Sequence, residues 1–255
     1  MKIPNFINQF EHIVIVSPHL DDAVFSAGSL LKKLVKAKKE VTYLNVFTSA
    51  SNHTSLSALM FLLQSKHKST TQLYKDRVAE DKQVLKSIGL TPNNLQMVDA
   101  LWRPKENIGF LGRFLAEFAL VYPTYRFHIL SGRVSKNDIH TQSDLVEKIR
   151  EYSNRPKTLI LGPAGIGGHV DHVLVRQAIE KTNLPYALWI DVPYNKRTGF
   201  VFNSYQKEHT HLSIKLDKKE ALEKLKLCQG YHTQYSAVFG QSSPEFNQED
   251  LLLCK

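Results

Sequence analysis

The chain has 255 residues, of which 42% are hydrophobic, and a formal net charge of +9. This length allows one large α/β domain or two small ones. No apolar stretch approaches the ~20 residues of a transmembrane helix, and the N-terminal residues lack a signal-peptide pattern, so we expect a cytoplasmic protein without a membrane span. Cys228 and Cys254 lack CxxC spacing. Histidines and carboxylates must therefore hold any metal.

The positive charge raises the question of a nucleic acid, an anionic membrane surface or an acidic substrate as partner. The lysines gather in two stretches, 32–40 and 215–226, where apolar residues alternate with them at helical spacing. This pattern is typical of a solvated helix face opposite a buried one. No RNA- or DNA-binding signature accompanies the charge, and we expect no nucleic-acid partner.

Short apolar runs alternate with helical patterns along the chain. The expected strands cover residues 12–18, 41–47, 95–99, 128–130, 158–163 and 186–193. The expected helices cover residues 23–36, 77–90, 110–122, 143–152 and 170–181, and a last helix starts at a capping-box-like Asp217 and Glu220. Strands separated by helices imply right-handed crossovers and a mostly parallel sheet. We predict an α/β fold, a three-layer Rossmann-like sandwich with helices on both faces of the sheet.

No internal repeat, low-complexity tract or linker interrupts this pattern, so we expect one domain over residues 1–255. The polar stretch 48–74 is longer than a usual loop. We expect it to form a mobile or partly helical insertion near the functional site.

The first motif, Pro-His-Leu-Asp-Asp at residues 18–22, directly follows the strand expected at 12–18. Its polar side chains, from His19, Asp21 and Asp22, can converge on one point from a tight turn. Aspartates are also common helix N-caps, and one of the two carboxylates would be ordinary in that role. Helix capping alone does not readily explain why two adjacent aspartates follow a histidine.

The second motif, Gly-Ile-Gly-Gly-His-Val-Asp-His at residues 165–172, follows another expected strand and offers His169, Asp171 and His172. Ligands of parallel sheets gather beyond the carboxyl ends of the strands. Two histidines and one carboxylate form a common catalytic zinc set, and a further carboxylate beside the open position can act as a general base. A structural role for a histidine after a glycine loop is the plain alternative. Together the two motifs favour a metal hydrolase.

These motifs resemble those of the PIG-L or LmbE-like zinc-dependent N-deacetylases. The first family motif, usually PHPDDE, stands here as Pro18–Ala23, and the second, HPDH, as residues 169–172. Further similar stretches are RVAED (77–81), VDALWR (98–103), IDVPY (190–194) and YHTQ (231–234). Each stretch is short, but they follow one another in the family's order from about residue 13 to residue 240.

The resemblance implies a role for each polar residue of the two motifs. The implied ligands of Zn²⁺, or of Fe²⁺ in vivo, are His19, Asp22 and His172. Asp21 is then the base that activates water, and His169 supports the developing oxyanion. Asp171 is implied to orient or tune a neighbouring histidine.

The same resemblance implies substrate contacts from Arg77 and Asp99, with help from Arg103. A helix salt bridge of Arg77 with Glu80 or Asp81 is an equal alternative. Asp99 and Arg103 could equally form a structural ion pair.

Asp191 and Tyr194 are weaker candidates, because a strand end followed by proline is ordinary architecture.

The sequence departs from the family pattern at a few positions. Ala23 replaces the usual glutamate of the first motif, and Leu20 and Val170 replace prolines. None of these positions ligates metal in the family pattern, so the chemistry is expected to survive. Some relatives place a tyrosine as an oxyanion donor where this chain has Gly167. Support for the oxyanion must then come from His169, the zinc or a residue elsewhere.

The resemblance implies a hydrolase that removes the acetyl group from an N-acetylglucosamine-type sugar or glycoconjugate. The positive charge would suit an anionic substrate. One alternative is a related amidase or transferase that uses the same metal site. Another is a non-catalytic sugar- or nucleic-acid-binding α/β protein.

Overall fold

The structure is a computed structural model that describes residues 3–51, 56–65, 67–103, 129–197, 209–240 and 243–254. The strands are β1 (His12–Ser17), β2 (Glu40–Ser49), β3 (Pro92–Val98), β4 (Thr158–Pro163), β5 (Tyr186–Trp189), β6 (His209–Lys215) and β7 (Gln248–Cys254). The α-helices are α1 (Asn5–Asn8), α2 (Asp22–Lys36), α3 (Leu56–Gln64), α4 (Thr70–Ser87), α6 (Ile139–Tyr152), α7 (Val170–Glu180), α8 (Tyr194–Arg197), α9 (Lys218–Gln229) and α10 (His232–Phe239). Two short 3₁₀ helices are η1 (Ala100–Trp102) and η2 (Lys136–Asp138).

The described strands form one seven-stranded sheet in the order β3-β2-β1-β4-β5-β7-β6. Strands β1 to β5 pair in parallel, whereas β7 is antiparallel to both β5 and β6. The predicted α/β fold with a mostly parallel sheet is therefore confirmed.

Some predicted elements differ from the structure. The strand expected at 128–130 is wrong where the structure can be compared, because residues 129 and 130 form a turn. The helix expected at 110–122 lies outside the described residues. Strands β6 and β7 were not predicted: β7 begins with three polar residues and β6 interleaves histidine and serine with its apolar residues, which hides both from a search for apolar runs.

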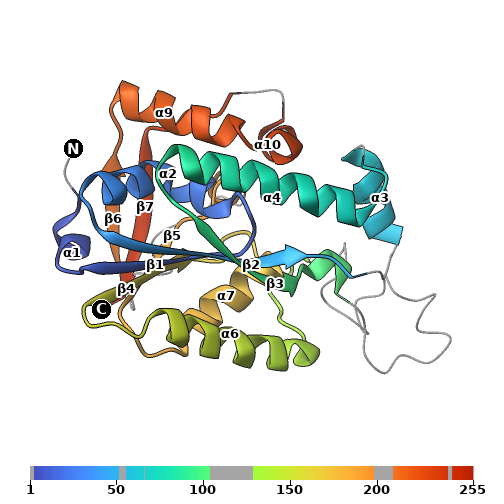
Figure 1. Cartoon of the computed structure of the whole chain (residues 1–255), viewed down its shortest axis with the longest axis horizontal. Helices are drawn as coiled ribbons and strands as arrows, with labels where there is room; N and C mark the ends of the chain where they lie inside the picture. Colours follow the sequence, from blue (N-terminus) through green and yellow to red (C-terminus); the bar gives the residue numbers. More distant parts are fainter. Residues whose placement is uncertain are drawn as a thin grey trace.

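Helices cover both faces of the sheet (Figure 1): α2, α4 and α9 lie on one face and α6 and α7 on the other. Successive strand residues point to opposite faces. Ile13 and Ile15 of β1 therefore pack in the cluster with α2, whereas Val14 and Val16 pack with α6 and α7. The three layers follow from this alternation.

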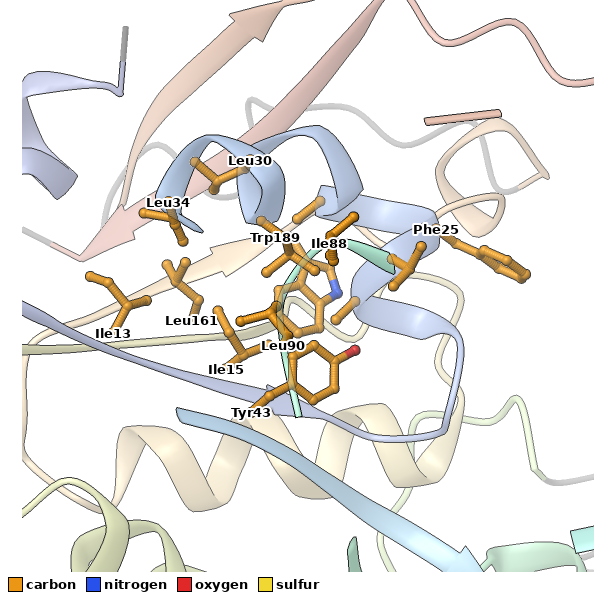
Figure 2. Close-up of a cluster of buried hydrophobic side chains, with 14 of the residues drawn as sticks. Ile13, Ile15, Phe25, Leu30, Leu34, Tyr43, Ile88, Leu90, Leu161 and Trp189 are labelled. Atoms are coloured by element: carbon orange, nitrogen blue, oxygen red, sulfur yellow. The ribbon is translucent and has the colours of Figure 1, made fainter. Parts of the chain in front are cut away.

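The larger core cluster joins the sheet to α2. Figure 2 shows Ile15 and Leu161 of the sheet with Leu30 and Leu34 of α2 around the ring of Trp189. These five side chains are at most 1% exposed, and burial of a side chain of this size contributes about 1.5–3 kcal/mol. This packing fixes α2 on the sheet.

The sheet order reverses between β1 and β4, because β1 is followed along the chain by β2 on one side and β4 by β5 on the other. Such a switch point leaves a crevice beyond the carboxyl ends of the two strands. The first motif follows β1 and the second follows β4, so the sheet brings both motifs to this crevice.

The long polar insertion expected at 48–74 is partly helical, since it contains α3 and the start of α4. The last predicted helix begins as expected, with the capping box of Asp217 and Glu220 at the start of α9. Within the described ranges, no helix combines the length and hydropathy needed to span a membrane.

Candidate metal centre

The turn after β1 is held by Ser17. Its hydroxyl donates to the carbonyl of His19 at 2.6 Å and accepts from the amide of Ala23 at 3.1 Å. Asp21 occupies the N-cap position of α2, but its side chain makes no capping hydrogen bond. The Asp22 carboxylate accepts instead from the backbone N–H of His19 at 2.9 Å. Helix capping therefore does not account for Asp21.

The glycines of the second motif allow its turn to form. Gly165, Gly167 and Gly168 all have positive φ, and a Cβ at Gly168 would lie 2.8 Å from the carbonyl oxygen of Leu130. Glycine is the residue that adopts this conformation without strain. The turn ends at His169, the N-cap of α7, whose Nδ1 accepts from the Asp171 amide at 3.3 Å.

The two motifs meet at one carboxylate oxygen. Asp22 Oδ2 lies 3.0 Å from His19 Nδ1 and 3.2 Å from His172 Nε2. One ligand atom from each of these three buried residues lies within 4.8 Å of the other two. Two imidazole nitrogens and one carboxylate oxygen around one point match a three-ligand zinc site with an open position.

The outer nitrogen of each of these histidines faces a second buried carboxylate. His19 Nε2 lies 3.2 Å from Asp171 Oδ2, and His172 Nδ1 lies 2.8 Å from Asp191 Oδ1. The other oxygen of Asp191 accepts from the amide of Ile166 at 2.8 Å, which fixes the carboxylate. Metal-binding histidines almost always have such a partner on the second nitrogen, because it sets the ring orientation and tautomer.

Asp171 is anchored from behind. Its carboxylate accepts from the amide of Ala100 at 2.9 Å and forms an ion pair with Arg103. Arg103 in turn has its Nε 3.3 Å from Asp138 Oδ1. The structure thus places Arg103 against Asp171 and Asp138, and Arg103 is not among the described residues that line the cavity.

The charges of this cluster favour a cation at its centre. Burial alone would lower the pKa of both histidines, but carboxylate neighbours dominate: Asp171 and Asp22 raise the pKa of His19 well above its usual value, and Asp22 and Asp191 raise that of His172 to about 10. The histidines in turn hold the pKa of Asp22 well below its usual range, despite its burial. The buried carboxylates thus keep positive charge at the two histidines, and a divalent metal ion fits in place of their protons.

Asp21 differs from Asp22 in its electrostatics. Burial, and then the negative charge of Asp22, raise the pKa of Asp21 to about 6, while the charge of Arg77 opposes the rise. A carboxyl group in this range is ionised at neutral pH and still basic enough to accept a proton.

A cavity of about 360 Å³ opens onto this cluster. All three expected metal ligands line it, together with Asp21, Arg77, Asp99 and His169. Phe61 of α3, Trp102 of η1 and Val238 of α10 supply apolar walls. The structure thus brings together the expected residues, except that Asp171 and Arg103 lie behind the described cavity lining.

Arg77 of α4 is held by α10. It donates to the side-chain oxygen of Gln234, and its guanidinium lies 5.3 Å from the ring centroid of Tyr74. The acidic residues that could have paired with Arg77 bond elsewhere: Glu80 accepts from Thr233 at 2.7 Å, and Asp81 accepts from the Tyr231 hydroxyl at 2.8 Å.

Three side chains of residues 77–81 therefore bond to three residues of the stretch 231–234.

Asp99 lies at the end of β3 beside the first motif. One carboxylate oxygen accepts from the Tyr74 hydroxyl at 2.8 Å and the other from the Leu101 amide at 2.9 Å. The first of these oxygens is also 3.7 Å from His19 Nε2. Asp99 thus offers a fixed hydrogen-bond acceptor to the cavity.

Comparison with known proteins agrees with this geometry. The family model described as PIG-L: GlcNAc-PI de-N-acetylase matches residues 14–183, about two thirds of the chain and both motifs of the metal centre. The chain belongs to the PIG-L family. A search of curated protein sequences gives no significant match.

Solved structures similar to this PIG-L protein share its fold over nearly the whole chain. The deacetylase of teicoplanin biosynthesis is 20% identical with a TM-score of 0.73, covering 94% of this chain and 96% of its own. A further structure of that enzyme is described as its zinc-inhibited form. The A40926 pseudoaglycone deacetylase is 21% identical with a TM-score of 0.68, covering 95% and 96%. The N,N'-diacetylchitobiose deacetylase from Pyrococcus horikoshii is 14% identical with a TM-score of 0.52, covering 98% and 86%.

One departure from the PIG-L pattern has a steric explanation. A Cβ on Gly167 would lie 2.7 Å from Tyr194 Cβ and Cδ1, so this position cannot carry a side chain while Tyr194 is in place. The Tyr194 ring lines the cavity and lies edge-on to His172 with 5.8 Å between ring centroids. Tyr194 was a weak candidate from the sequence. Its contact with His172 depends on the fold and could not be read from spacing.

Proposed function

We propose that this protein is a metal-dependent hydrolase that removes the acetyl group from an N-acetylglucosamine-type sugar or glycoconjugate. One observation carries the proposal: Asp22 Oδ2 lies between His19 and His172. The neighbouring aspartate, Asp21, makes no side-chain hydrogen bond that would cap helix α2. The family description and the deacetylase names of similar structures support the same reaction.

The donor set of two imidazoles and one carboxylate suits Zn²⁺, with Fe²⁺ as the alternative native metal. When bound, the metal ion would acidify a coordinated water and polarise the amide carbonyl. Asp171 and Asp191 would keep both histidines in the ligating orientation, because each accepts from the ring nitrogen that faces away from the centre.

Asp21 is the proposed general base. It faces the cavity, makes no capping bond and has a pKa raised to about 6 by burial. It would take a proton from the attacking water and return it to the departing amine nitrogen. The C–N bond then breaks to leave a free amine and acetate.

His169 is the proposed oxyanion donor. Its Nδ1 accepts a backbone N–H, so in the neutral ring the proton sits on Nε2. Burial, and then the positive charges of His19 and His172, hold the pKa of His169 well below its usual value. A neutral Nε2–H would thus be available to the oxygen on which negative charge develops.

Arg77 and Asp99 are proposed to contact the polar groups of the substrate, since both line the cavity with fixed side chains. An anionic substituent would find its counter-charge in Arg77. For Arg103 we propose an indirect role instead, because it is buried against Asp171.

We further propose that residues 1–255 form one catalytic domain, since β1 and β7, from opposite ends of the chain, belong to one sheet. A cytoplasmic location and the absence of a nucleic-acid partner stay predictions from the sequence.

Acetate release from a panel of N-acetylglucosamine conjugates tests this function. We expect the protein to release acetate, a chelator to abolish this release and added metal to restore it. Hydrolysis of other amides, but no acetylated sugar, would favour the related amidase. Salt-sensitive affinity for nucleic acid, or affinity for a sugar, without turnover would favour the binding protein.

A further inference from the structure

Helix α2 is broken one turn after the metal-binding residues. Ala27 has φ −132° and ψ 24°, outside the helical region, so the helix consists of two halves. The first half begins at Asp22, with Asp21 as its N-cap. The orientation of this half therefore decides where both carboxylates point.

A break inside a helix leaves backbone groups without their usual partners. Here two side chains from the C-terminal part of the chain supply them. Glu249 of β7 accepts from the amides of Ser29 and Leu30, both at 2.8 Å. Lys224 of α9 donates to the carbonyl oxygen of Ser26 at 3.1 Å. The carboxylate thus caps the start of the second half and the ammonium group caps the end of the first.

Lys224 and Glu249 also bind each other. Lys224 Nζ lies 2.8 Å from Glu249 Oε1, and both side chains are 0% exposed. Burying two charges costs desolvation energy that their attraction often fails to offset, so stability alone is a weak explanation for such a pair. The three backbone hydrogen bonds require one orientation of this ion pair, with the acceptor at residue 249 and the donor at residue 224.

The residue before the break also contacts the loop behind His172. The Ser26 hydroxyl accepts from the amide of Val192 at 3.2 Å. Val192 follows Asp191, whose carboxylate holds His172. Ser26 therefore links the Lys224 contact on one side to the loop that orients His172 on the other.

We propose that Lys224 and Glu249 are positioning residues of the metal centre: they hold the break in α2 and so set Asp22 against His172. This inference rests on the proposed function, in which these ligands bind a metal. Both residues lie beyond residues 14–183, the part matched by the family model.

The test compares the loss of two ion pairs, each of which includes a residue of α9. The double variant Lys224→Met/Glu249→Gln removes the capping pair without leaving a single uncompensated charge. The control is Lys33→Met, because Lys33 lies in the second half of α2 and pairs with Glu220 of α9 at 3.2 Å, and both of these side chains are also buried. The control breaks an ion pair between α2 and α9 without touching the helix break.

Metal affinity is measured by chelator competition with Zn²⁺, and ligand geometry by the absorption spectrum of the Co²⁺ form, at a temperature where circular dichroism shows each variant folded. We expect the double variant to bind Zn²⁺ at least about tenfold more weakly, with an altered Co²⁺ spectrum. Lys33→Met should lose thermal stability and keep both metal readouts. Wild-type affinity and spectrum in the double variant would overturn the proposal.

A swapped variant, Lys224→Glu/Glu249→Lys, separates capping from charge pairing. It keeps the ion pair but places a donor against the two amides and an acceptor against the Ser26 carbonyl. We expect the same loss of metal affinity, and wild-type affinity would contradict the positioning role. A wild-type protein that binds no metal would contradict the proposed function. Equal metal binding by the wild type and the variant would contradict only the positioning role.

Discussion

Asp22 and His172, which belong to different motifs, lie 3.2 Å apart with both side chains buried. His19 approaches the same carboxylate oxygen at 3.0 Å. The contact depends on the neighbouring positions of β1 and β4 in the sheet, since each motif follows one of these strands. The candidate metal centre therefore depends on the sheet order as much as on the motifs.

Removal of a ligand should abolish metal binding. We expect His172→Ala to weaken Zn²⁺ binding by more than ~100-fold and to abolish turnover, because two ligands hold the ion poorly. His140→Ala, an exposed histidine on α6, is the control and should bind one metal like the wild type. Metal content after dialysis measures both. Full metal content in His172→Ala would remove His172 from the ligand set.

Asp21→Asn should keep the metal and lose the reaction. Asparagine has nearly the same shape but cannot accept the proton, so kcat should fall by about 10²–10⁴ with Zn²⁺ affinity unchanged. Steady-state kinetics and metal analysis on the same preparation check this. A kcat within a few-fold of the wild type would show that another group is the base.

The pH profile should follow the titration of Asp21. Burial raises the pKa of this carboxyl to about 6, and only the ionised form acts as a base, so kcat/KM should fall about tenfold per pH unit below pH 6. The residual activity of Asp21→Asn should lack this acid limb. An identical limb in that variant would assign it to loss of the metal ligands instead.

Metal binding should release protons. Carboxylate neighbours raise the pKa of His172 to about 10 and that of His19 well above its usual value, so both rings are protonated in the metal-free protein at pH 7. A metal must displace these protons, and the apparent affinity should therefore rise with pH, about tenfold per unit for each proton lost. Chelator competition between pH 6 and pH 8 measures the slope. A flat profile would contradict the ligand set.

The carboxylates behind the histidines should matter nearly as much as the ligands. We expect Asp191→Asn to weaken Zn²⁺ binding by about 10–100-fold, because His172 loses the partner that fixes its tautomer. Asp250→Asn is a matched control: the Asp250 side chain also lies 2.8 Å from a histidine, His211 of the edge strand β6, but neither residue is among the described residues that line the cavity. Equal metal affinities for the two variants would argue against the orienting role.

Gly167→Ala should disturb the cavity. Its φ of +86° costs an alanine about 1–2 kcal/mol, and the new Cβ would displace Tyr194. Gly240→Ala carries the same kind of conformational cost at φ +69° but meets nothing within 4 Å. Both variants should lose stability in thermal melts, whereas only Gly167→Ala should lose turnover. Equal turnover by Gly167→Ala and Gly240→Ala would show that the position of Tyr194 does not affect the reaction.

The sequence predicted the parts of this protein that depend on local pattern. Buried strands such as β1 and β4 are apolar runs, and each motif lies next to one of them, so the α/β fold and the meeting of the two motifs could be foreseen. Spacing also identified Asp21 and Asp22, although it could not divide them into a base and a ligand. The difference in their pKa comes from contacts with His19 and His172, which only the fold provides.

The parts that could not be predicted rest on contacts between distant segments. Asp191 behind His172 and Gln234 behind Arg77 were visible only as fragments of weak motifs. Lys224 and Glu249 carried no signal, because a lysine in a lysine-rich helix and a glutamate in a half-polar strand both suggest solvent exposure. Both side chains bond to backbone groups around the break at Ala27, which helical periodicity hides.

An acetate-release assay would show whether His19, Asp22 and His172 hold a metal with which Asp21 cleaves an N-acetyl amide. Purified protein is assayed on N-acetylglucosamine conjugates as isolated, after chelation, and after addition of one equivalent of Zn²⁺ or Fe²⁺. We expect the release of acetate and free amine in equal amounts, and this release should be lost on chelation, restored by metal and absent in Asp21→Asn. Acetate release that persists without metal, or that Asp21→Asn retains at the wild-type rate, would contradict it.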